Sequence, residues 1–166
     1  MSIILRKWEL NDIPSLVKYL NNINIWNNVR DRMPSPYTQK DAEEFISKQK
    51  IIDPNVNFAI VYNNEVTGGI SILLKEDVSR IGAEIGYWLA EPFWGKGITT
   101  AAIGQLADYA FKNFAIERLY AEVYEHNKAS MRALEKNGFY LESIRKKAVI
   151  KNNVVMNDHV YVKLKM

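Results

Sequence analysis

The spacing of apolar residues changes along the chain, and the changes predict the order of strands and helices. Alternating or continuous apolar runs of four to twelve residues are typical of β-strands. Such runs lie at Ile3–Trp8, Phe58–Tyr62, Val66–Leu74, Arg80–Leu89, Arg118–Tyr124, Phe139–Ile150 and Val154–Leu164. Apolar residues at helical spacing, preceded by capping residues, predict four helices. These run from Asn11 or Asp12 to about Leu20, from Thr38 past Ile46, from about Thr99 to Asn113, and from Asn127 to Lys136.

Turn residues support these boundaries. Asn63–Asn64 and Asn152–Asn153 each separate two strand runs, which indicates a hairpin. Thr38 and Asp41 have the spacing of a capping box in which Asp replaces the usual Glu, and Asn137–Gly138 is typical of a helix C-terminus. The resulting order, βααβββαβαββ, predicts a mixed α/β (α+β) fold with helices packed on a sheet.

The composition narrows the class of protein. A chain of 166 residues predicts a single domain over residues 1–166. Because there is no cysteine, disulfides, a cysteine nucleophile and thiolate metal sites are excluded. The two histidines, His126 and His159, are too far apart in sequence for a zinc motif. We therefore expect no bound metal.

The charge pattern and the apolar runs bear on location and partners. The net charge is only +3, and basic residues are interleaved with acidic ones, which does not favour dedicated nucleic-acid binding. No apolar run reaches the roughly 20 residues that span a bilayer, and Met1–Trp8 is too short and too soon charged for a signal peptide. We expect a soluble cytoplasmic protein without a nucleic-acid or membrane partner.

The segment Pro92–Ala102 carries the strongest chemical signal. Gly95 and Gly97 lie at the junction between a predicted strand and a predicted helix. Such a turn leaves the backbone unshielded and can direct several N–H groups, together with the positive end of the helix dipole, at one phosphate. A lone Gly-x-Gly also occurs in plain strand-to-helix turns, so the interpretation depends on the rest of the chain.

Four segments taken together resemble the GNAT superfamily of N-acetyltransferases, in particular the branch of ribosomal-protein alanine and spermidine acetyltransferases. The segments are Pro36–Ile46, Glu84–Leu89, Phe93–Ala102 and Asn127–Phe139. They follow the order and spacing of that family over nearly the whole chain. The resemblance implies a mostly antiparallel mixed sheet that splays at a bulge, near Gly86 here, with helices on both faces.

The resemblance also implies acetyl-CoA as cosubstrate. Backbone N–H groups from Trp94 to Thr99 would hold the pyrophosphate, Asn127 would bond the pantetheine arm, and a backbone N–H between Tyr87 and Leu89 would stabilise the oxyanion. The full set implied for coenzyme binding is Tyr87, Trp88, Leu89, Trp94, Gly95, Lys96, Gly97, Ile98, Thr99, Thr100, Asn127 and Ser130. Two positions depart from the usual pattern, namely Trp94 in place of Gln or Arg and Thr99 in place of Gly or Ala. Asn127 also has the sequence of a helix N-cap, and the two roles are compatible.

Two residues are the candidates for catalysis. Glu84 would take the amine proton, directly or through water, although strand alternation alone would also make it a surface carboxylate. Ser130, one helical turn after Asn127, would hydrogen-bond the leaving thiolate, or else cap the helix. Many family members carry a tyrosine as acid at the position of Leu134, so the leucine shifts that role to Ser130.

The acceptor site is expected in the polar segment Asn21–Tyr37. Trp26 is the candidate for its wall, Tyr124 and Trp88 for the cleft lining, and Glu84 for contact with the amine. Large aromatic side chains are more often core residues, and His126, Asp158 and His159 are weaker candidates for the same cleft.

The predicted function is acetyl-CoA-dependent N-acetylation of a primary amine by direct attack in a ternary complex. A protein or peptide N-terminus is the first acceptor, with polyamines or other small amines as the alternative, which would demand an acidic cleft. A protein of another class, a non-catalytic acyl-CoA-binding or sensing domain, would keep the Gly95–Thr99 turn without a working amine site. The sequence does not distinguish between a monomer and a homodimer.

Overall fold

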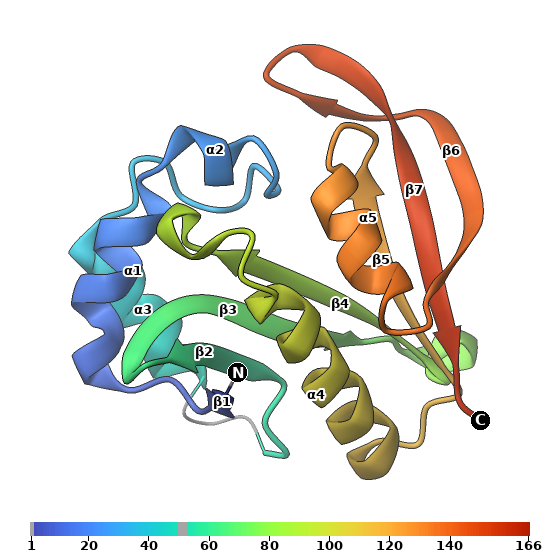
Figure 1. The fold of residues 1–166 in the computed structure, drawn as a ribbon, viewed down its shortest axis with the longest axis horizontal. Coiled ribbons are helices and arrows are strands. Elements are labelled where there is room, and N and C mark those ends of the chain that lie inside the picture. The colour runs from blue at the N-terminus through green and yellow to red at the C-terminus, as the bar shows by residue number, and fades with distance from the viewer. Residues whose placement is uncertain (1, 50–52) are drawn as a thin grey trace.

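The computed structural model describes residues 2–49 and 53–166, and its strands form one mixed sheet with helices packed against it (Figure 1). The strand order is β1-β2-β3-β4-β5-β7-β6. Neighbouring strands are antiparallel except for β4 and β5, which are parallel. The strands are β1 (Ile3–Arg6), β2 (Asn57–Tyr62), β3 (Glu65–Leu74), β4 (Gly82–Leu89), β5 (Arg118–Tyr124), β6 (Tyr140–Lys151) and β7 (Val154–Leu164).

The helices confirm the predicted order and add one element. They are α1 (Ile13–Leu20), α2 (Ile23–Trp26), α3 (Gln39–Gln49), α4 (Ile98–Asn113) and α5 (Lys128–Glu135), with 3₁₀ turns at Leu10–Asp12, Asp77–Ser79 and Glu91–Phe93. The added helix, α2, lies in the segment that was expected to be irregular. It spans one turn, too short for apolar periodicity to reveal, and Asn22 caps it by accepting from the Asn24 N–H at 2.8 Å.

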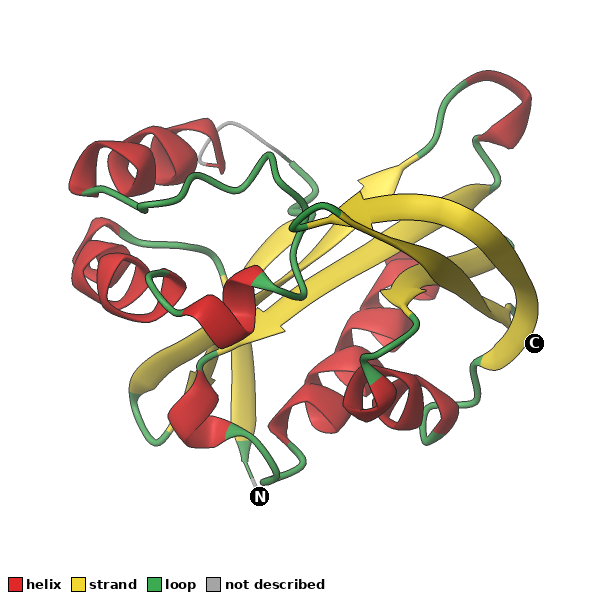
Figure 2. Cartoon of the chain, turned by 90° about the horizontal axis from the view of Figure 1, so that it is seen from above, coloured by secondary structure: helices red, strands yellow, loops and turns green. Residues whose placement is uncertain are grey.

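Helices cover both faces of the sheet, as predicted (Figure 2). Side chains of β2 alternate between the two layers. Phe58 and Ile60 belong to the core under α4 and α5, whereas Ala59 and Val61 belong to the core under α1 and α3. In β4, the same alternation assigns Ile85 and Tyr87 to the first of these faces and Trp88 to the second.

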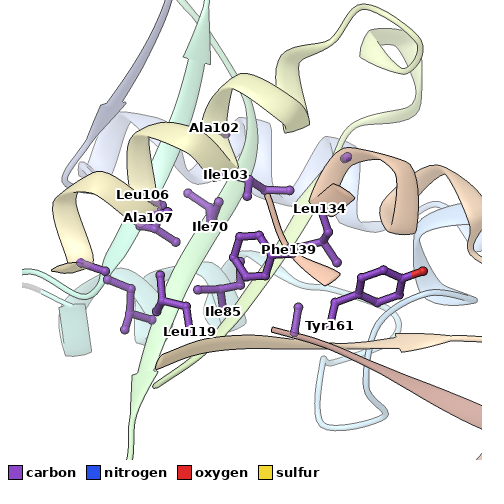
Figure 3. Packing of buried hydrophobic residues seen from close by; sticks show 14 of the residues in the cluster. Ile70, Ile85, Ala102, Ile103, Leu106, Ala107, Leu119, Leu134, Phe139 and Tyr161 are labelled. Atoms are coloured by element: carbon purple, nitrogen blue, oxygen red, sulfur yellow. The ribbon is translucent and has the colours of Figure 1, made fainter. Parts of the chain in front are cut away.

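The larger core layer ties α5 and the last strands to α4. Ile103 of α4 packs near Ile70 and Ile85 of the central strands, with Leu134 and Phe139 beside them (Figure 3). Leu134 is fully buried there. The position at which relatives carry a tyrosine acid is therefore a packing position in this protein.

The central strands diverge, as the family resemblance implied. β4 and β5 pair over three residues only, from Gly82↔Arg118 to Glu84↔Tyr120. Beyond that point β4 stays paired with β3 and β5 stays paired with β7. The expected bulge near Gly86 is wrong, because the β3–β4 register runs past Ser71↔Gly86 without a shift. The gap arises from loss of pairing between twisted strands, with no inserted residue in β4.

The start of α1 also differs from the prediction. Asp12 makes no capping hydrogen bond to α1. Its buried carboxylate accepts two bonds of 2.8 Å from the Arg6 guanidinium and one of 2.8 Å from the Glu9 N–H. These bonds turn the chain immediately after Arg6, so β1 ends there and does not reach Trp8.

Other predicted turns are confirmed. The Asp41 carboxylate accepts from the Thr38 N–H at 2.8 Å, and the Thr38 hydroxyl accepts from the Asp41 N–H at 3.2 Å, which completes the capping box. All four residues of the Asn63–Asn64 and Asn152–Asn153 turns have positive φ, as tight hairpins require. Gly138 ends α5 with a φ of +78°.

Asn137 joins helices α4 and α5, which lie on the same face of the sheet. Its side-chain amide donates to the carbonyls of Thr100 in α4 at 2.9 Å and of Ala133 in α5 at 2.8 Å. A β-carbon on Gly104 would lie 2.8 Å from the Asn137 Oδ1, so the missing side chain permits this close approach. The joint holds the start of α4 against α5.

In the ranges 2–49 and 53–166, none of the helices has the length and apolar character needed to cross a membrane. Within the same ranges, no three His, Cys, Asp or Glu residues are placed together to hold a metal ion.

Candidate active site

The gap between β4 and β5 opens into a cleft of about 1200 Å³. Its lining includes residues of β4 and β5, the start of α4, helix α5 and the segment from α2 to α3. The structure brings together most of the predicted site residues here, namely Glu84, Tyr87, Trp88, Leu89, Trp94, Gly95, Gly97, Ile98, Thr99, Thr100, Tyr124, Asn127 and Ser130.

The glycine turn has the geometry expected of an anion site. Gly95 and Gly97 have φ values of +73° and +75°, which side chains other than glycine rarely adopt. No atom lies within 4 Å of a β-carbon built on Gly95, so the backbone there is open. Gly97 is the N-cap of α4 and offers no side-chain cap. The first N–H groups of this 16-residue helix are therefore available to an anion in the cleft.

Trp94 anchors the turn through its side chain. Its indole Nε1 donates to the Leu89 carbonyl at 2.7 Å. Glu91, three residues before Trp94, accepts from the side-chain amides of Asn22 at 2.7 Å and Asn24 at 2.9 Å. The turn is thus tied both to the end of β4 and to α2. The sequence assigned Trp94 a backbone role only, and the indole contact needs the folded positions of both residues.

Two predicted site residues lie outside the cleft lining. The Lys96 ammonium sits 5.2 Å from the centre of the Phe93 ring, and Lys96 is not among the residues that line the cleft. Trp26 packs under the Lys151 ammonium, 3.4 Å from the ring centre, and its Nε1 donates to Asn152 Oδ1 at 3.2 Å. Trp26 therefore does not form the cleft wall. It binds α2 to the β6–β7 turn, because α2 is helical and turns its indole toward the hairpin.

Other residues of the segment Asn21–Tyr37 do line the cleft. The residues that replace Trp26 in the wall are Asn24, Ile25, Asn28, Val29, Arg30, Asp31, Arg32, Met33, Pro34 and Tyr37. His126 closes the same side by bonding Asn28 Oδ1 at 2.8 Å.

Asn127 caps helix α5 through its side chain, whereas the Ser130 hydroxyl makes a separate contact. Asn127 Oδ1 accepts from the Ser130 N–H at 3.2 Å, so the N-cap expectation is confirmed. The Ser130 hydroxyl lies 2.6 Å from the Tyr87 hydroxyl. The alternative in which the serine side chain caps the helix is not observed, and the hydroxyl stays within the cleft.

The Tyr87 hydroxyl is a feature that the sequence interpretation missed. Alternation along β4 places Tyr87 and Leu89 on the α4–α5 face, opposite Trp88, and this periodicity could have revealed the pairing with α5. Burial raises the pKa of the phenol above its ordinary value of 10, while the hydrogen bond with Ser130 opposes the rise. Burial thus favours the protonated form of the Tyr87 phenol.

Glu84 is buried on the other face of the sheet. It is 8% exposed, so it is not a surface carboxylate. It forms an ion pair with Arg30, and its second oxygen lies 3.3 Å from the Lys75 ammonium. β5 places Glu122 on the same face, 3.1 Å from the Arg30 guanidinium. Arg30 belongs to the polar segment after α2, and no sequence motif identified it.

A second arginine extends this charged cluster. Arg145 of β6 lies 2.8 Å from Glu122 and also pairs with the fully buried Asp158 of β7. Burial raises the pKa of Asp158, and Arg145 opposes the rise. Asp158 does not reach the cleft lining, nor does His159. Both weaker candidates therefore lie behind the cleft.

Two basic side chains on α5 were also missed. Arg132 and Lys136 are one helical turn apart, exposed, and line the cleft beyond Ser130. They add positive charge on the face that carries the open N-terminus of α4. Their i, i+4 spacing was visible in the sequence, but only the position of α5 places them on the cleft.

Comparison with known protein families is consistent with this fold and cleft. Residues 2–140 match the family model described as an acetyltransferase (GNAT) domain. The match covers most of the chain, so the chain belongs to the GNAT acetyltransferase family. The family and the fold predicted from the sequence are thereby confirmed.

Individual relatives are consistent with this assignment. The chain is 47% identical over 77 residues to the "Probable N-acetyltransferase YjcK" of Bacillus subtilis (strain 168), a match that covers 46% of this chain and 42% of that protein. It is 35% identical over 109 residues to the "Putative ribosomal N-acetyltransferase YdaF" of the same strain, covering 66% and 58%. The chain thus spans about half the length of these curated relatives.

A solved structure resembles nearly the whole chain. The self-immunity acetyltransferase MccE, determined in complex with acetyl-CoA and AMP, superposes with a TM-score of 0.83 at 28% identity. The match covers 98% of this chain and 92% of that one.

Proposed function

We propose that the protein transfers the acetyl group of acetyl-CoA to the N-terminal amine of a protein or peptide by direct attack in a ternary complex. One observation carries the proposal. The gap between β4 and β5 connects a face with an open helix N-terminus and a hydroxyl pair to a face with a buried carboxylate. Such an arrangement suits a thioester entering from one side and an amine from the other.

The residues on the α4–α5 face fit coenzyme A. The backbone N–H groups from Trp94 to Thr99 would take the pyrophosphate, and the hydroxyls of Thr99 and Thr100 would add bonds. Beyond Glu84, the edge of β4 that faces β5 has no strand partner. Pantetheine amides would pair with that edge, and one N–H between Tyr87 and Leu89 would stabilise the oxyanion. Asn127 would bond the pantetheine arm.

Glu84 would receive the amine proton, through water. A free α-amine has a pKa near 8, compared with about 10.4 for lysine, so it needs only weak assistance. The carbon–nitrogen bond forms as the amine attacks the thioester carbon, and the carbon–sulfur bond then breaks. The proton passes to Glu84 or to the water that it holds.

Tyr87 and Ser130 would stabilise the departing sulfur. A thiol has a pKa near 8.5, far below that of either hydroxyl, so neither hydroxyl gives up its proton to the thiolate. Ser130 would donate a hydrogen bond to it, and Tyr87 would hold Ser130 in the donating orientation.

The charges of the cleft favour a peptide over a polyamine. A polyamine site requires free carboxylates, whereas Glu84 and Glu122 are both paired with Arg30. The name of the relative YdaF points to a ribosomal acceptor. The alternatives remain acetylation of a polyamine and non-catalytic binding of acyl-CoA. The placement of Glu84 and Ser130 in one cleft opposes the second of these.

The test is release of free thiol from acetyl-CoA in the presence of N-terminal peptides, spermidine and aminoglycosides. Peptide-dependent release supports the proposal, whereas release with spermidine alone supports the polyamine alternative. Coenzyme binding without release for any amine supports the non-catalytic protein. Ser130→Ala should lower turnover and leave the dissociation constant of coenzyme A within about twofold, which separates chemistry from binding.

A further inference from the structure

We infer that Arg30 determines which acceptors enter the cleft, because it pairs with two carboxylates that would otherwise be open to a polycation. The inference rests on the proposed function and names the excluded class as diamines and polyamines. Arg30 is thus a specificity-determining residue, distinct from the groups that perform the acyl transfer.

The contacts of Arg30 are those of a counter-ion inside the cleft. Its guanidinium nitrogen Nη2 contacts Glu84 and lies 3.1 Å from Glu122. These carboxylates come from β4 and β5, so Arg30 spans the gap between the diverging strands. Its side chain is 42% exposed, compared with 10% for Glu84 and 22% for Glu122. The cation therefore covers the two acids on the side from which an acceptor arrives.

The wider cluster is balanced in charge. Its three carboxylates belong to Glu84, Glu122 and Asp158, and its three cations belong to Lys75, Arg30 and Arg145. A neutral cluster gives a cationic acceptor no net attraction. Loss of any one cation leaves an excess of one negative charge in a partly buried setting, where screening by solvent is weak.

Arg30 differs from the other two cations in position. Arg30, Glu84 and Glu122 line the cleft, whereas Lys75 and Arg145 contact the carboxylates from outside the lining. Removal of Arg30 would therefore expose the two acids to the cleft itself. The effect is selection by exclusion, since the arginine repels the ammonium groups of an unwanted acceptor.

The peptide acceptor is affected differently. A peptide N-terminus brings one amine, neutral at the moment of attack, and no second ammonium group close to it. A polyamine brings at least one further charged amine, which would have to sit beside the Arg30 guanidinium. We therefore expect the arginine to penalise polyamines and to spare peptides that lack basic residues near the terminus.

The experiment compares Arg30→Gln with Arg118→Gln. Arg118 makes a bidentate ion pair with Glu142 at 2.8 and 2.7 Å, outside the cleft, so its loss changes the net charge equally. For Arg30→Gln we expect kcat/KM for spermidine to rise at least about tenfold relative to that for a neutral peptide. Arg118→Gln should leave this ratio unchanged. Arg30→Lys, which keeps the charge, should stay near the wild type.

A second substitution tests the balance of charges. Adding Glu122→Gln to Arg30→Gln restores neutrality and should remove the gain with spermidine. Glu122→Gln alone keeps Arg30 and leaves the cluster at a net charge of +1. It should shift preference from basic toward acidic peptide acceptors, so the inference remains testable even if Arg30→Gln fails to fold.

The outcomes separate the inference from the function on which it rests. A wild-type protein that releases no thiol with any amine refutes the proposed function. A wild-type protein that acetylates peptides, with no spermidine gain in Arg30→Gln and no shift in Glu122→Gln, refutes the role of Arg30 alone. Efficient acetylation of spermidine by the wild type also overturns that role.

Discussion

The hydroxyl groups of Tyr87 and Ser130 lie 2.6 Å apart, where β4 faces the first turn of α5. The serine stands in the expected motif, but the phenol comes from a strand 43 residues earlier. Leu134 fills the α5 position at which relatives place a tyrosine. The phenol in the cleft therefore belongs to Tyr87 of strand β4, and its hydroxyl contacts the hydroxyl of Ser130.

Tyr87→Phe should lower kcat about tenfold while leaving the KM for acetyl-CoA within about twofold. The substitution removes one hydroxyl next to a charged leaving group, a loss of roughly 1.5–3 kcal/mol when the hydrogen bond is direct and less when it acts through Ser130. Steady-state thiol release measures both constants. Tyr109→Phe is the control, because its hydroxyl donates to the Asn55 carbonyl at 2.9 Å, outside the cleft.

Coupling between the hydroxyls gives a separate expectation. If Tyr87 acts through Ser130, the double variant Tyr87→Phe/Ser130→Ala should be no slower than Ser130→Ala alone. Losses that add in full would show that the two hydroxyls work independently.

Stability should fall above pH 10 because of two buried tyrosines. Burial raises the pKa of Tyr87, and burial together with the charge of Asp41 raises the pKa of Tyr37 to about 12. In the unfolded chain both titrate near 10. The folded state holds these protons more tightly, so stability is intact below pH 10 and is lost as the pH rises through the folded pKa values. Urea unfolding at pH 8 to 11 measures the decline, which Tyr87→Phe should reduce.

Gly97→Ala should weaken coenzyme binding at least about tenfold and cost roughly 1–2 kcal/mol of stability. The reason is the φ of +75° at the start of α4, which an alanine adopts only with strain. Calorimetric titration with coenzyme A gives the affinity. Gly82→Ala is the control, since the nearest atom to its β-carbon is 3.5 Å away. Equal losses of affinity in both variants would contradict the anion-site assignment.

Trp94→Phe should raise the dissociation constant of coenzyme A by about threefold to tenfold. It removes the 2.7 Å bond from the indole to the Leu89 carbonyl, which corresponds to roughly 1 kcal/mol of turn anchoring. Trp26→Phe removes a comparable indole bond of 3.2 Å to Asn152 outside the cleft, and should leave coenzyme affinity unchanged. A similar loss in both variants would argue against anchoring by Trp94.

Local patterns predicted much of this structure. The glycine turn, the Asn127 cap and the hairpin turns depend on neighbours within a few residues, so the sequence contained the necessary information. The ion pair that accompanies the burial of Glu84 depends on a distant partner. Arg30 is the clearest case, because its carboxylate partners lie 54 and 92 residues away. Pairings of that range arise from the path of the chain, and a single sequence carries no periodic signal for them.

Trp26 illustrates the opposite error. A tryptophan in a polar segment was a sensible candidate for a binding wall, but a one-turn helix directs it to Lys151 and Asn152. The neighbouring residues of the segment took the predicted place. The segment that contributes to the cleft lining was therefore predictable, whereas the side chains that line the cleft were not.

Three residue pairs join β4 to β5, so the sheet consists of two halves that are paired over a short stretch. One half contains β1–β4 and the other contains β5–β7. Beyond the paired stretch, the two parts of the domain meet through contacts such as Asn137 to Thr100 and Lys151 to Asp31. A molecule bound between the two halves would contact both and hold them together. A ligand at one hundred times its dissociation constant stabilises a folded protein by about 2.7 kcal/mol. The supply of coenzyme in the cell would then regulate how long each copy of this protein survives.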